Sequence, residues 1–122
     1  MKDIEAIVIH GNKLGRDLGF PTANMQIVGD EVEERGVYRS SVVIDGERYD
    51  AMSNIGTRPS VDGHELRLET HIIGFSGDLY GRRLSIRLEE KIRDEKKFAS
   101  LDELKAQLKC DHDTILQMIG RS

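Results

Sequence analysis

The sequence of 122 residues predicts a mainly β fold, an antiparallel sheet closed into a barrel and followed by one C-terminal α-helix. Three observations support this fold class. At least five β-rich runs follow one another, with short turns and no helical pattern between them. Asp45-Gly46 stands between two of these runs and is a strong hairpin signal. After Phe98 the hydrophobic period changes from that of a strand to that of a helix.

The strands are predicted from runs of β-branched and other apolar residues that end at glycine, proline or aspartate. We expect strands, in chain order, at residues 4–10, 25–28, 37–44, 48–55, 65–75 and 84–88. Turns or loops are expected at 29–36, 45–46, 56–60, 61–63 and 76–78. A sheet of this size in a small domain closes most economically into a barrel, which also removes exposed edges.

The run at 65–75 shows the clearest strand period. Leu66, Leu68, Thr70 and Ile72 fall on one face, while Arg67, Glu69, His71 and Ile73 fall on the other. Alternation of this kind is typical of a strand that is buried on one side.

The C-terminal helix is predicted to begin at a capping box. Ser100 and Glu103 have the S-x-x-E spacing in which the serine caps the helix and the glutamate reaches back to the Ser100 amide. Five apolar residues then recur at helical spacings: Leu101, Leu104, Leu108, Ile115 and Met118. The pattern leaves open an interruption of the helix near Asp111. The helix is therefore expected to be amphipathic and to lie against the barrel.

Length and composition favour one soluble, cytoplasmic domain. The net charge is −4, with charges of both signs mixed along the chain, and only 5% of the residues are aromatic. This argues against binding of nucleic acid, which favours basic patches and aromatic stacking platforms. No apolar run is long enough to cross a bilayer, and the N-terminal residues lack a signal-peptide core. Cys110 is the only cysteine and is expected to be a small buried side chain.

A glycine-rich loop is the first candidate site. Gly15 and Gly19 give the backbone room to approach a ligand, and their neighbouring amides can form an anion nest. Pro21 stiffens the segment that follows, and Thr22 and Asn24 carry hard oxygen donors two residues apart, which suits Mg²⁺ and its phosphates. The segment has no Walker A spacing. An ordinary turn that leads into a strand is the alternative.

Glu69 is the second candidate. A carboxylate in the middle of an ordered strand could accept a proton from an alcohol during phosphoryl transfer. The alternative is a solvent-facing carboxylate paired with Arg67. His71 shares that face and could be a second base or an orienting partner, although a lone histidine on a strand is more often packed or on the surface.

Four other segments each allow a functional and a structural interpretation. Asn54 to Pro59 could form a glycine turn of a site or a purely structural turn, and Tyr80 between Gly77 and Gly81 could flank a flat base or cover a barrel end. Residues 93–95 could grip a polar ligand or be solvated charge. The acidic cluster at 30–34 is interpreted as a solvated face.

Several motifs occur together in one order and resemble the riboflavin kinase family from about residue 5 to 113. They are GRDLGFPTAN at 15–24, GVY at 36–38, NIGTRPS at 54–60, ETH at 69–71, GDLYG at 77–81, RDEKKF at 93–98 and SLDELKAQLKCD at 100–111. Three departures concern loops: Ser60 where the family often has threonine, no glycine near Asp50 or Ala51, and no proline just before GVY.

The resemblance implies a six-stranded antiparallel Greek-key β-barrel with a C-terminal helix: a barrel over about 4–92, a charged loop at 93–99 and a helix at about 100–119. It makes Glu69 the catalytic base and Thr22 and Asn24 the ligands of Mg²⁺ or another divalent ion. The implied ATP-binding residues are Gly15, Arg16, Gly19, Pro21, Thr22, Asn24, Asp78, Tyr80 and Gly81. The implied riboflavin-binding residues are Arg93, Glu95, Phe98 and Leu104.

The function that the resemblance implies is transfer of the γ-phosphoryl group of ATP to the 5′-hydroxyl of riboflavin, giving FMN and ADP. A flavin- or nucleotide-binding module without turnover is the alternative. In bacteria this module usually follows an adenylyltransferase domain in a bifunctional riboflavin kinase/FAD synthetase, so the chain is interpreted as a stand-alone kinase or as an excised C-terminal module. We expect a monomer.

Overall fold

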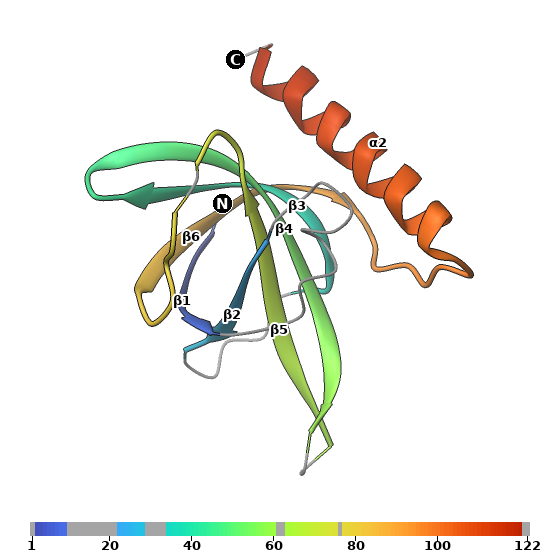
Figure 1. The fold of residues 1–122 in the computed structure, drawn as a ribbon, viewed down its shortest axis with the longest axis horizontal. Helices are drawn as coiled ribbons and strands as arrows, with labels where there is room; N and C mark the ends of the chain where they lie inside the picture. The colour runs from blue at the N-terminus through green and yellow to red at the C-terminus, as the bar shows by residue number, and fades with distance from the viewer. Residues whose placement is uncertain (1, 10–21, 29–33, 61–62, 76, 121–122) are drawn as a thin grey trace.

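The structure is a computed structural model and describes residues 2–9, 22–28, 34–60, 63–75 and 77–120. Within these ranges, six strands form a closed antiparallel barrel in the order β1-β2-β5-β4-β3-β6, and one helix follows (Figure 1). The elements are β1 Lys2–Ile9, β2 Ala23–Ile27, β3 Gly36–Ile44, β4 Glu47–Ser60, β5 Gly63–Ile72, β6 Arg83–Arg93 and α2 Leu101–Gly120. Strands β3, β4 and β5 are successive neighbours, and β6 returns beside β3, which is a Greek-key arrangement. The predicted fold class is confirmed.

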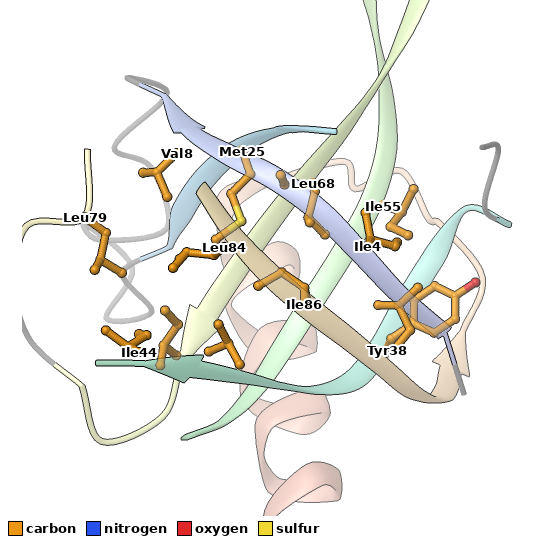
Figure 2. Packing of buried hydrophobic residues seen from close by; sticks show 14 residues of the cluster. Ile4, Val8, Met25, Tyr38, Ile44, Ile55, Leu68, Leu79, Leu84 and Ile86 are labelled. Atoms are coloured by element: carbon orange, nitrogen blue, oxygen red, sulfur yellow. The ribbon is translucent and has the colours of Figure 1, made fainter. Parts of the chain in front are cut away.

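The barrel interior is filled by one alternate set of side chains from every strand. Figure 2 shows this set, which includes Met25, Leu68 and Ile86, with Leu79 at one end and Tyr38 at the other. Those three side chains have no exposed area. Full burial of such a side chain contributes about 1.5–3 kcal/mol, so the interior strongly favours this strand register.

Three hydroxyl groups form a chain through the otherwise apolar interior. Ser53 on β4 lies between Ser40 on β3 and Thr70 on β5, and all three residues are fully buried. The Ser40 and Ser53 oxygens are 2.8 Å apart, and the Ser53 and Thr70 oxygens are 2.9 Å apart. Because each hydroxyl has a hydrogen-bond partner, burial of these polar groups costs little and the three strands are linked.

The β3–β4 hairpin has the predicted turn. Asp45 and Gly46 both have positive φ angles, 52° and 84°, which a two-residue turn of type I′ requires. Ile44 pairs with Glu47 directly beside this turn.

The turn predicted at 56–60 is wrong, because β4 continues to Ser60 and pairs with β5 throughout. The pairing of β3 with β4 ends at Gly36 and Ile55, so the rest of β4 has no strand neighbour on that side among the described residues. A proline is tolerated on such an edge, which explains Pro59. In Figure 1 this part of the β4–β5 hairpin extends beyond the other strands.

Helix α2 is continuous and packs on the outer surface of the barrel. Its Ile115 is fully buried against Val37 of β3 and Met52 of β4. The Glu103 amide donates to Ser100 Oγ over 3.2 Å, as the capping box predicts, but the Glu103 carboxylate accepts from the Ala99 amide instead of the Ser100 amide. The prediction for Cys110 is wrong: its side chain is exposed, because the next residue, Asp111, faces the barrel.

Asp111 ties the helix to the end of β6. The residue is only 2% exposed, and its carboxylate accepts from Arg93 Nε at 3.0 Å and Nη2 at 2.9 Å. Gln107 donates a further hydrogen bond of 2.9 Å. This fully satisfied charge fixes the start of the loop at 94–100, because Arg93 is the last residue of β6.

Candidate functional site

A row of polar side chains crosses the outer surface of the barrel. Asn24 on β2 pairs with Glu69 on β5, and Glu69 pairs with Asn54 on β4. Their immediate neighbours, such as Met25 and Leu68, point into the barrel, so these three side chains point outward. Side chains directly opposite each other on antiparallel strands lie about 4.5–5.5 Å apart at Cβ. The structure therefore makes the predicted base a neighbour of a predicted metal ligand.

The environment of Glu69 suits a proton acceptor. Its carboxylate reaches solvent, yet the surrounding protein is dense enough that desolvation raises its pKa above the usual value, against the opposing effect of the Arg67 charge. A pKa moved toward neutrality lets the carboxylate take up a proton more readily. Desolvation has a larger effect on the pKa of Glu69 than its possible surface partner Arg67.

Thr22 lies one residue before β2, half-buried, two positions from Asn24. An extended backbone places such side chains on one face. A hydroxyl and an amide carbonyl are hard oxygen donors, and Mg²⁺ bound to a nucleotide takes only one or two protein ligands beside phosphates and water. The two residues therefore fit the ion. No group of three His, Cys, Asp or Glu side chains that could hold a metal occurs among the described residues.

The remaining nucleotide-side predictions fall in two places. Gly15, Arg16, Gly19 and Pro21 lie outside the described residues. The segment with Asp78, Tyr80 and Gly81 belongs to the connection between β5 and β6.

This connection covers one end of the barrel. Leu79 is buried in the interior, and the Gly81 amide donates to the Val8 carbonyl over 2.9 Å. Asp78 accepts from the Tyr80 amide, also at 2.9 Å, and the Tyr80 side chain is 55% exposed. Both interpretations of this segment thus have a basis: Leu79 covers the barrel end, and the Tyr80 ring stands outside it.

His71 faces the helix. Its ring centroid is 5.5 Å from that of His112 on α2. A packed histidine is the simpler interpretation, and the geometry gives no separate support for a second base.

Comparison with known proteins assigns the family. The family model described as Flavokinase, riboflavin kinase, matches residues 2–119. The chain belongs to the riboflavin kinase family. It is 48% identical over 105 residues to the bifunctional riboflavin kinase/FMN adenylyltransferase of Pseudomonas fluorescens, covering 85% of this chain and 34% of that protein. It is also 45% identical over 118 residues to the protein of the same description from Escherichia coli (strain K12), and the match covers 96% of this chain and 38% of that protein.

The chain therefore spans only about a third of the length of these relatives. A crystal structure described as a macrolide-efflux protein from Streptococcus pneumoniae is similar with a TM-score of 0.85 and 37% identity, over 93% of this chain and 38% of that one. Among the described residues, no helix is long and apolar enough to span a membrane.

The residues that the resemblance to riboflavin kinase assigned to the flavin lie at the end of β6, in the loop that follows it and at the start of α2. Arg93 is held by Asp111 and donates from Nη1 to the Asp94 carbonyl over 3.0 Å, and its guanidinium lies 5.8 Å from the centre of the Phe98 ring. Its visible role is to position the loop. Phe98 and Leu104 are both half-buried, at the end of this loop and in the first turn of α2.

The fourth residue, Glu95, reaches back over the barrel surface. A Cβ atom added at Gly56 would lie 2.6 Å from Glu95 Oε1, so the carboxylate covers this glycine closely. Gly56 follows Asn54 by two residues on β4 and shares its outer face. The loop carboxylate is thus brought to the row of Asn24, Glu69 and Asn54.

Sequence reasoning missed the roles of Asn54 and Asp111. The sequence leaves a turn of a site and a structural turn open for the segment from Asn54, and alternation with Ile55, which the structure buries, is the signal that places Asn54 on the outer face. The sequence leaves open an interruption of the helix near Asp111, and only the packing of α2 on the barrel reveals the pairing of Asp111 with Arg93.

Proposed function

We propose that this chain transfers the γ-phosphoryl group of ATP to the 5′-hydroxyl of riboflavin, giving FMN and ADP. The observation that carries the proposal is the register of β2 with β5, which pairs Asn24 with Glu69. The match of the riboflavin kinase family model to residues 2–119 supports the same reaction.

Phosphoryl transfer asks a protein mainly for alignment and for neutralisation of charge. Glu69 would accept the proton of the 5′-hydroxyl as its oxygen bonds to the γ-phosphorus and the bond to ADP breaks. Thr22 and Asn24 would hold Mg²⁺, which when bound neutralises phosphate charge. Asn24 and Glu69 are directly opposite on their strands, so both groups would stand at one reacting centre.

The test is formation of FMN from riboflavin, ATP and Mg²⁺, followed by chromatography. Glu69→Gln keeps the size of the side chain and removes the base, so kcat should fall by about 100- to 10 000-fold while riboflavin still binds. Glu90→Gln, an exposed position on β6, is the matched control and should retain activity. Wild-type turnover in Glu69→Gln would remove Glu69 from the mechanism, and no FMN from the wild-type protein would favour a binding module.

Thr22→Ala should weaken nucleotide binding in the presence of Mg²⁺ and leave metal-free binding less affected. A Mg²⁺ titration of nucleotide binding measures this, and an unchanged titration would contradict the ligand assignment. From the names of the relatives we also propose that an adenylyltransferase domain is a partner of this domain. A cytoplasmic location and a monomeric state stay predictions from the sequence.

A further inference from the structure

Among the residues that the structure describes, Asn54 carries a buried oxygen without a hydrogen-bond partner. Its Oδ1 atom is inaccessible to solvent and accepts no hydrogen bond within the part of the chain that the structure describes. A buried acceptor left in this way destabilises a folded protein, because it has lost its hydrogen bonds to water. Such an atom is therefore expected to meet a donor from a ligand, particularly beside a candidate base.

Two carboxylates stand near Asn54, and Arg67, a donor, lies opposite Gly56 on the same outer face. Glu69 stands opposite Asn54 on β5, and the Glu95 carboxylate covers Gly56 two residues further along β4. Ionised carboxylates only accept hydrogen bonds, as does the Asn54 oxygen. A ligand group that meets the oxygens of these three residues must therefore be a hydrogen-bond donor. An ionised phosphate oxygen has no proton to donate, so it cannot be the partner of Asn54 Oδ1.

The row also has a direction. Asn24 lies on the β2 side of Glu69, and Asn54 lies on the opposite side, toward β3. Beyond Asn54 the pairing runs to Val37 and then to Arg93, where the loop carrying Glu95 begins. With phosphates on the Asn24 side, the rest of the acceptor substrate must extend from Glu69 past Asn54 toward this loop.

We propose that Asn54 Oδ1 accepts a hydrogen bond from a secondary hydroxyl of the ribityl chain while the terminal 5′-hydroxyl faces Glu69. This rests on the proposed function, since it deepens the recognition of the same substrate. A polyol offers hydroxyl donors on neighbouring carbons, and it therefore matches a row of acceptors on neighbouring strands. Asn54 is a specificity-determining residue for the polyol chain.

The experiment combines Asn54→Leu with riboflavin analogues that each lack one secondary ribityl hydroxyl. Affinity is measured without ATP, by quenching of flavin fluorescence, and KM values are measured for both substrates. In the wild-type protein one analogue should bind about tenfold more weakly than riboflavin. Asn54→Leu should weaken riboflavin binding by a similar factor, leave the KM for ATP unchanged, and no longer distinguish that analogue from riboflavin.

Two matched variants sharpen the result. Asn54→Asp keeps an acceptor oxygen and should still distinguish the analogue, whereas Gln26→Leu, at an exposed position on β2, should behave as wild type. Equal discrimination by wild type and Asn54→Leu, or a changed KM for ATP alone, would overturn the assignment. Failure of the wild-type protein to make FMN would instead contradict the proposed function, and the titration, which needs no turnover, would still decide the role of Asn54.

Discussion

Removal of the Asp111 carboxylate should destabilise the fold more than any exposed substitution on the same helix. Asp111→Ala leaves the Arg93 guanidinium, whose side chain is 19% exposed, without its buried counter-ion and takes away the acceptor of Gln107. Loss of one partner from a buried ion pair typically costs about 3–5 kcal/mol. For a chain of this length, that corresponds to a fall in Tm of roughly 10–20 °C.

The assay is urea unfolding followed by far-ultraviolet circular dichroism, which gives the free energy of unfolding. Asp113→Ala, an exposed position two residues later, is the control and should change that energy by less than about 0.5 kcal/mol. The double variant Arg93→Met with Asp111→Leu replaces the pair with apolar groups and should recover most of the loss. If the free energy of unfolding of Asp111→Ala lies within about 1 kcal/mol of the wild-type value, the view that this pair holds the helix to the barrel is refuted.

Three further predictions follow from the contacts. Ser53→Ala should lower the free energy of unfolding by about 1–3 kcal/mol, because two buried hydroxyls lose a partner; urea unfolding measures this, and no loss would contradict it. Gly56→Ala should displace the Glu95 carboxylate and raise the KM for riboflavin while the KM for ATP stays constant; an unchanged riboflavin KM would count against the contact. Arg67→Met should move the acidic limb of the kcat/KM profile to higher pH, because Arg67 lowers the pKa of Glu69 and activity needs the deprotonated carboxylate; a limb that does not move, or moves down, would contradict this.

The strands that alternation or a turn signal marked were predictable from the sequence. Asp45-Gly46 specified its hairpin through two positive φ angles, and the period of two correctly divided the inner and outer faces around Glu69. The extent of β4 was not predictable in this way. Pro59 is a strand breaker in general, but here it lies where β4 has already lost its β3 neighbour, and that depends on the length of β3.

The sequence was enough to predict which residues form the candidate site, but not which of them are neighbours in the fold. Thr22, Asn24 and Glu69 could be named from their chemistry, whereas the adjacency of Asn24 and Glu69 depends on β2 pairing with β5, two strands that are not consecutive. Local pattern carries no information about such a pairing. The ion pair of Arg93 with Asp111 was hidden for the same reason, because it joins a strand end to a helix that packs on the barrel.

The positions of Asn24, Glu69 and Asn54 on the outer surface depend on the packing of the barrel interior. Because side chains alternate along a strand, a shift of β5 by one residue would turn Glu69 into the apolar interior and bring Leu68 to the surface. Leu68 is fully buried, and the Thr70 hydroxyl is bonded to Ser53, so such a shift would expose an apolar side chain and break a buried hydrogen bond together. The residues that fix the position of Glu69 relative to Asn24 and Asn54 therefore lie directly beneath it, and substitutions there should change the geometry of the site without touching a ligand.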